Sequence, residues 1–91
     1  MQHKNFKKEK LHKAIGKILK QSRIKNSKMS LNKFSYSYEI DRGNLSKIEK
    51  GLVGCSITTA WRITEALGIS FSEFALLLEK ELGKDFKLMD E

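Results

Sequence analysis

Apolar positions recur along this chain with the period of an α-helix. The first such segment begins at Leu11, and its apolar residues are spaced by three or four positions. The residues that follow Leu11 in this stripe are Ala14, Ile15, Ile18 and Leu19. The pattern predicts an amphipathic helix that ends near Ile24, with lysines on its polar face.

Two short helices with clear start signals are predicted next. Ser30 precedes Leu31–Tyr38, and Asp41 precedes Arg42–Lys50. Both side chains can accept a hydrogen bond from an unpaired amide of the first helical turn. Glu39 and Ile40, which lie between Tyr38 and the cap Asp41, form a turn. Gly51 stands where a helix commonly ends in a left-handed residue.

A fourth and a fifth helix complete the pattern. Ser56 caps the fourth helix and Gly68 ends it, while Ser70 and Glu73 have the S-x-x-E form of a capping box for the fifth, which reaches about Leu82. The expected inner faces are Ile57, Ala60, Trp61, Ile63, Thr64 and Leu67 in the fourth helix, and Phe74, Leu77 and Leu78 in the fifth. No stretch alternates long enough to form a strand. The fold class is therefore predicted to be all-α, with five helices in one compact bundle.

Length and charge divide the chain into three parts. Ninety-one residues fit one small domain, predicted as a basic flexible arm (1–9), a helical domain (10–82) and a polar tail (83–91). The net charge is +7, and residues 1–28 hold ten Lys or Arg against one acid. A basic end on a small protein favours a polyanionic partner, nucleic acid before a membrane surface. The lysines of residues 1–28 either follow phosphates or form a solvated face.

Several functional classes receive no support from the sequence. The single Cys55 excludes an intramolecular disulfide and suits a reducing compartment. No signal-peptide or transmembrane run is present, so we expect a cytoplasmic protein without a membrane partner. His3 and His12 lack metal-ligand spacing, so no metal site is expected. No nucleophile–base pair or phosphate-binding loop stands out, so we expect neither an enzyme nor a cofactor.

The third helix has the side chains that a DNA-reading helix needs. Leu45 and Ile48 can be buried together against a bracing helix. Arg42 and Lys47 then point outward, and both can donate to guanine O6 and N7 in the major groove. The residues better placed for phosphates are Asn44 and Lys50. The sequence therefore predicts a sequence-specific protein that binds double-stranded DNA.

Residues 30–51, SLNKFSYSYEIDRGNLSKIEKG, resemble the helix-turn-helix of the lambda-repressor-like (Xre) transcriptional regulators. The family pattern reads S-Q-x-x-L-A-x-x-x-G-[VI]-S-x-x-[ST]-[IL]-S-[RK]-[IL]-E-x-G. The chain follows it without a gap at Ser30, Phe34, Ile40, Arg42, Leu45, Ser46, Lys47, Ile48, Glu49 and Gly51. The similarity extends from Ile15 to Ser70 and includes the string EALGIS.

This resemblance implies a five-helix lambda-repressor-like domain and a role for each matching residue. Arg42, Gly43 and Lys47 occupy base-facing positions. The positions that contact the sugar-phosphate backbone hold Ser30, Asn44 and Lys50. Arg23 and Glu49 match a structural ion pair between the first and third helices. The resemblance also implies a prokaryotic or phage regulator of the repressor type that binds palindromic DNA as a homodimer.

The chain departs from the family pattern at several positions. Leu31 replaces a phosphate-contacting glutamine, so that contact is lost or moves to Asn32 or Lys33. Glu39 replaces the turn glycine, which predicts a turn without the usual left-handed residue. The loop after the first helix is one residue longer, and Ser35 replaces an alanine. Gly43 either lets the backbone of the third helix come close to a base pair or leaves this helix with one base-contacting side chain fewer.

Two other functions fit the same bundle. One is an antitoxin-type regulator that binds a partner toxin as well as its own operator. The other is a protein-interaction module that has lost DNA reading, which Leu31, Glu39 and Gly43 favour. The fifth helix bears on both, because its apolar residues on more than one face make it either well buried or a dimer surface.

Overall fold

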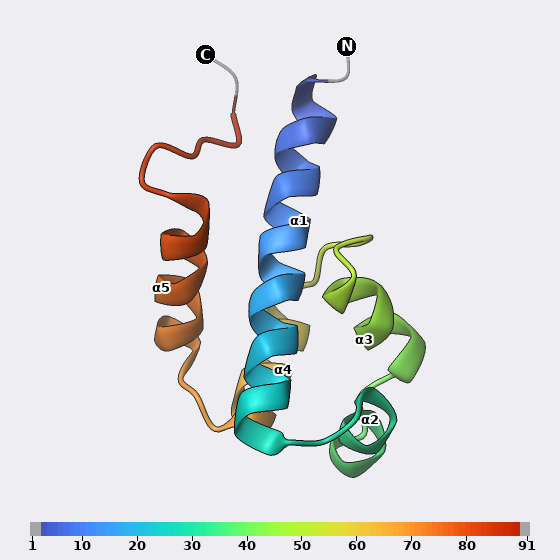
Figure 1. The fold of residues 1–91 in the computed structure, drawn as a ribbon. Helices are drawn as coiled ribbons and strands as arrows, with labels where there is room; N and C mark the ends of the chain where they lie inside the picture. Colours follow the sequence, from blue (N-terminus) through green and yellow to red (C-terminus); the bar gives the residue numbers. More distant parts are fainter. Residues whose placement is uncertain (1–2, 90–91) are drawn as a thin grey trace.

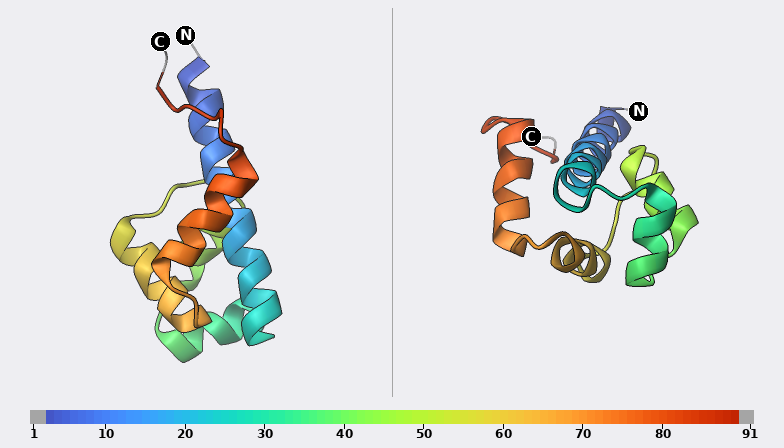
Figure 2. Two further views of the ribbon diagram at one scale, coloured as in Figure 1. Left: turned by 90° about the vertical axis from the view of Figure 1, so that its left-hand side faces the viewer. Right: turned by 60° about the horizontal axis from the view of Figure 1, so that its bottom comes forward.

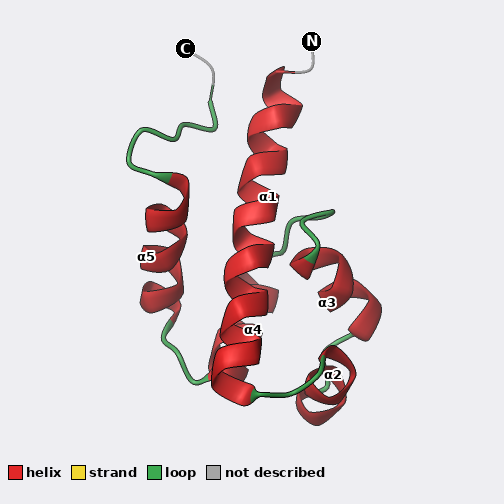
Figure 3. Cartoon of the chain, in the orientation of Figure 1, coloured by secondary structure: helices red, strands yellow, loops and turns green. Residues whose placement is uncertain are grey.

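The computed structural model describes the backbone of residues 3–89 and the side chains of residues 6–89. It contains five α-helices and one π-helical turn (Figures 1 and 3), and no strand within residues 3–89. The elements are α1 (His3–Ser22), the π-helical turn (Arg23–Ser27), α2 (Leu31–Tyr38), α3 (Arg42–Glu49), α4 (Ile57–Leu67) and α5 (Phe71–Leu82). The all-α prediction is confirmed.

The first helix begins earlier than the hydrophobic pattern predicts. α1 starts at His3, so residues 3–9 of the expected flexible arm are helical here. Lysine, glutamate and similar residues favour helix even without an apolar stripe, and no glycine or proline interrupts this segment. Residues 1–2 of the arm and 90–91 of the tail lie outside the described part of the chain.

The described part of the tail runs beside the start of α1. Lys10 Nζ lies 5.7 Å from the centre of the Phe86 ring, and Lys7 donates to the carbonyl oxygen of Met89 at 3.4 Å. Figure 1 shows the start of α1 and the described end of the tail at the same end of the molecule, away from α2. The longest dimension, 43 Å, follows from this extension of α1 and the tail beyond the bundle.

α1 ends in a π-helical turn, Arg23–Ser27. The amide of Lys28 donates to the carbonyl of Arg23 at 3.2 Å, five residues back instead of four. The Ser27 hydroxyl donates to the same carbonyl at 2.6 Å. Lys28 then adopts a left-handed conformation, with φ +58°, and starts the connection to α2.

The predicted caps of the other four helices are present. Each cap side chain accepts a hydrogen bond from the amide three residues later, at 2.7–3.1 Å. These caps are Ser30, Asp41, Ser56 and Ser70. Gly51 and Gly68 have φ of +75° and +78°, as expected for helix ends.

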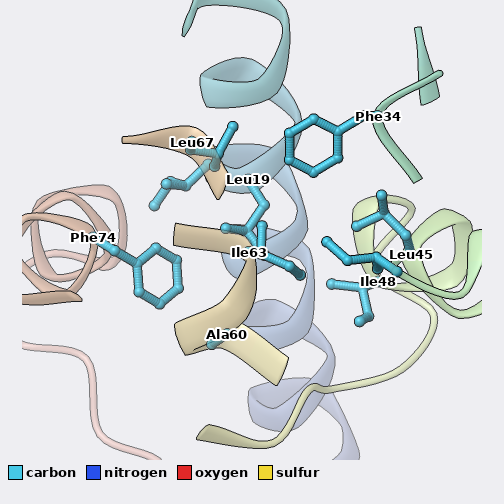
Figure 4. Packing of buried hydrophobic residues seen from close by; sticks show 10 residues of the cluster. Leu19, Phe34, Leu45, Ile48, Ala60, Ile63, Leu67 and Phe74 are labelled. Atoms are coloured by element: carbon cyan, nitrogen blue, oxygen red, sulfur yellow. The ribbon is translucent and has the colours of Figure 1, made fainter. Parts of the chain in front are cut away.

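One core joins all five helices, and α1 lies at its centre. Figures 1 and 2 show α1 between α5 on one side and α2 and α3 on the other, with α4 behind. Phe34 and Ile48 are fully buried, and the buried apolar residues of α1, α3, α4 and α5 all come from the predicted apolar stripes. Figure 4 labels eight of the ten core residues: Leu19, Phe34, Leu45, Ile48, Ala60, Ile63, Leu67 and Phe74.

Three residues expected to face inward are exposed instead. Ile57 is 66% exposed, Trp61 50% and Leu77 39%. The narrow stripe of Ala60, Ile63, Thr64 and Leu67 fills the contact between α4 and the core, which leaves Trp61 about 100° away around the helix. Trp61 stacks on the half-buried Phe71, with ring centres 5.1 Å apart. The alternative of a well-buried α5 is wrong, because Leu76 is exposed too.

Candidate nucleic-acid interface

α2 and α3 are joined by an unusual turn. Glu39 adopts the left-handed conformation, with φ +54°, so the expectation of a turn without such a residue is wrong. The amide of Ile40 closes the end of α2 by donating to Ser35 O at 2.9 Å. Arg62 of α4 holds the turn from outside by donating to Glu39 O at 2.9 Å. These bonds and the burial of Ile40 outweigh the backbone strain at Glu39.

α3 divides cleanly into a buried side and an exposed side. Leu45 and Ile48 are buried in the core, as the spacing predicts. The predicted DNA-contacting residues of this segment all lie on the exposed side: Arg42, Gly43, Asn44, Lys47 and Lys50. The buried side chains therefore anchor α3 in the core, while its hydrogen-bond donors face solvent.

A buried ion pair holds the C-terminal end of α3 against α1. Arg23 donates through Nε and Nη2 to the two carboxylate oxygens of Glu49, at 2.8 and 3.0 Å. Its third nitrogen donates to Met29 O at 2.6 Å. The hydrogen bond to Glu49 raises the pKa of Arg23 further, although burial opposes this. The predicted structural pair is present, and its charges are satisfied within the protein.

Glycine allows α1 and α3 to cross very closely. A Cβ atom at Gly16 would overlap the carbonyl oxygen of Ile48 and lie 2.7 Å from that of Glu49. A Cβ atom at Gly51 would lie 2.7 Å from the Lys13 side chain. The end of α3 and the start of the next loop are therefore fixed on α1, which sets the angle at which α3 is presented.

The first turn of α2 supplies the remaining predicted residues. Ser30 is exposed, and its oxygen caps the Lys33 amide at 3.1 Å. The Lys33 side chain is exposed next to it. Leu31 is half-buried against the core, which explains how an apolar residue is accommodated at this position.

One contact in this turn was not anticipated. Asn32 Oδ1 accepts a hydrogen bond from Arg42 Nε, so the two helices also meet at their exposed edge. In the sequence, the replacement of the family's glutamine by Leu31 pointed to Asn32 only as a substitute contact to phosphate. A pairing between residues ten positions apart across a turn has no signal in the hydrophobic pattern.

A lysine of α1 also belongs to this face of the molecule. Lys20 and Lys50 border a shallow pocket whose other walls are Arg23, Leu31, Ser46 and Glu49. Lys7 and Lys10 lie instead beside the C-terminal tail, and Lys17 pairs with Glu81 of α5 at 2.9 Å. Lys20 is thus the α1 lysine that adjoins α2 and α3 in this pocket.

Comparisons of the chain with protein-family models, with curated proteins and with solved structures found no match. Within the described residues, no three His, Cys, Asp or Glu side chains gather where they could hold a metal ion. None of the helices in that range has both the length and the apolar character needed to span a membrane.

Proposed function

We propose that this protein is a sequence-specific double-stranded DNA-binding regulator of transcription, similar to the lambda-repressor-like (Xre) family. The observation that carries the proposal is the two-sided character of α3. Its inner side is locked into the core by Leu45 and Ile48. Its outer side presents Arg42, Asn44 and Lys47 to solvent on a short, rigid helix.

The dimensions of α3 suit the major groove. A helix with its side chains is about 10–12 Å across, and the groove is about 12 Å wide and admits one helix. In this proposal Arg42 and Lys47 donate to base edges. The residues that contact phosphates are Ser30, Lys33, Asn44 and Lys50, which fix the position of the helix without reading sequence.

A second copy of the chain fits the same proposal. Ile57, Trp61, Leu76 and Leu77 leave apolar side chains exposed on α4 and α5. A homodimer that covers this surface would place two copies of α3 on a palindromic site. The same surface favours the alternative in which a partner protein, such as a toxin, binds α4 and α5 while α3 holds the operator.

Selection of binding sites from a random duplex library tests the proposal directly. We expect the wild type to enrich a motif, and Arg42→Ala and Lys47→Ala each to lose preference at particular base pairs. A good bidentate contact contributes about 1–3 kcal/mol of discrimination. Lys80→Ala, on the exposed side of α5, is a matched control that should keep the full motif.

The opposite result has a clear form. If the wild type enriches no sequence and its residual binding falls steeply with salt in all variants alike, the basic surface binds polyanions without specificity. The major-groove proposal then fails, and a protein partner becomes the function to pursue.

A further inference from the structure

The contact between Arg42 and Asn32 bears on how α3 would read a base. Arg42 is the first residue of α3, and Asn32 is the second residue of α2. Arg42 donates through Nε to Asn32 Oδ1, and both side chains are otherwise exposed. A guanidinium at the surface normally samples many orientations, and this bond selects one of them.

The surrounding residues explain why Asn32 is the partner. The adjacent carboxylate of Asp41 caps α3 by accepting a hydrogen bond from the backbone amide of Asn44 at 2.7 Å. Within residues 6–89, no ion pair joins Arg42 to an acidic side chain. Leu31 faces the core, and Asn32 lies about 100° further around α2. An amide oxygen on α2 is therefore the acceptor that Arg42 uses.

The atom that is engaged determines what remains for DNA. An arginine has five N–H donors, one on Nε and four on the two terminal nitrogens. With Nε held by Asn32, the two terminal nitrogens are left as an end-on pair, which can meet guanine O6 and N7. The Nδ2 group of Asn32 keeps its own N–H donors for a phosphate. One amide would then connect the backbone contact of α2 with the base reader of α3.

We infer that Asn32 is a positioning residue that orients Arg42 and thereby sets the preference for guanine at one position of the DNA site. This inference rests on the proposed function. It requires two effects to be separable, because the loss of a phosphate contact weakens binding to every duplex whereas the loss of orientation changes the preference at one base pair.

The test uses the duplex that the wild type selects and single-base-pair variants of it. The position in question is the base pair at which Arg42→Ala loses preference. Asn32→Leu removes the acceptor at similar size, and Asn32→Asp keeps an acceptor for Nε. Lys33→Ala is the control from the same turn of α2. The measurement is the ratio of dissociation constants for G·C and A·T at each position.

We expect Asn32→Leu to reduce the G·C preference at that single position by about three- to tenfold, a part of the total that one bidentate contact supplies. Asn32→Asp should keep the G·C preference at that position, because it retains an acceptor for Nε. It should weaken binding to all duplexes, because its negative charge lies near phosphates. Lys33→Ala should weaken binding uniformly and reduce its dependence on salt.

Two results would overturn the inference in distinguishable ways. If the wild type enriches a motif and Asn32→Leu leaves every preference unchanged, or lowers affinity for all duplexes equally, Asn32 does not orient Arg42 while the proposed function stands. If Arg42→Ala changes the base preference at no position, Arg42 reads no base and the inference falls. If the wild type enriches no motif at all, the proposed function falls as well.

Discussion

Ser35 of α2 is the one residue among the described ones whose side-chain polar atom is buried without a hydrogen-bond partner. It lies on the inner side of α2 at 4% exposure. We predict that Ser35→Ala raises the free energy of unfolding by about 1 kcal/mol, because it removes an unsatisfied buried hydroxyl. Chemical denaturation measures this, with the exposed Ser37→Ala as control. A loss of stability in Ser35→Ala would contradict the prediction.

Gly43 is the residue whose presence the fold explains least. A Cβ atom there would meet nothing nearer than Asp41 Oδ2, at 3.6 Å, and α3 needs no glycine in its first turn. We predict that Gly43→Ala stabilises the protein by about 0.5–1 kcal/mol and weakens binding to the selected duplex, because the added methyl stands between α3 and a base pair. Unfolding and binding titrations of the same variant measure both effects. Unchanged DNA affinity would show that Gly43 only leaves α3 without a base-contacting side chain at this position.

At the scale of the elements, the turn between α2 and α3 stores strain at Glu39. Glycine has no steric penalty in the left-handed conformation, so we predict that Glu39→Gly increases stability by about 0.5–1 kcal/mol. Gly68 provides the matched opposite case, since its φ is +78° and a Cβ atom there would touch nothing. Gly68→Ala should cost about 1 kcal/mol through the backbone alone. A neutral or destabilising Glu39→Gly would contradict this prediction and would show that the left-handed conformation costs Glu39 little.

The boundaries of α2 to α5 followed from the sequence because local chemistry determines them. Ser30, Asp41, Ser56 and Ser70 each cap a helix within one turn, and such short-range signals can be recognised without tertiary structure. The start of α1 was missed because residues 3–9 have helical propensity but no apolar period.

The candidate site was only partly predictable for a related reason. The division of α3 into buried Leu45 and Ile48 and exposed Arg42 and Lys47 follows from the helical period. The bond from Arg42 to Asn32 depends on how two helices cross, and Trp61 was placed inside because apolar character alone does not say which of two neighbouring stripes fills the core. These features belong to the tertiary arrangement.

For the whole molecule, the exposed apolar residues of α4 and α5 predict self-association. We expect the wild type to have the mass of a dimer by light scattering at the concentrations used for DNA binding. Leu76→Glu, which places a charge on the exposed side of α5, should shift the protein to monomer without changing its helix content. Leu52→Glu is the control, because Leu52 is similarly exposed on the loop after α3.

The outcome that would contradict dimerisation is a wild-type protein that remains monomeric even on the selected duplex. Unchanged dimer mass in Leu76→Glu would place the contact elsewhere on the molecule. Either result leaves the role of α3 to be judged by the selection experiment alone.

The π-helical turn at Arg23–Ser27 has a consequence for protein engineering. A π-helical turn holds one residue more than an α-helical turn, while Arg23 within it and Ser30 after it both make their hydrogen bonds. We therefore expect that the chain can change its length by one residue at this point without displacing α3. Loop grafts and chimaeras that exchange the first helix would best be joined there, at the exposed Ile24, where a mismatch in register can be absorbed by the backbone.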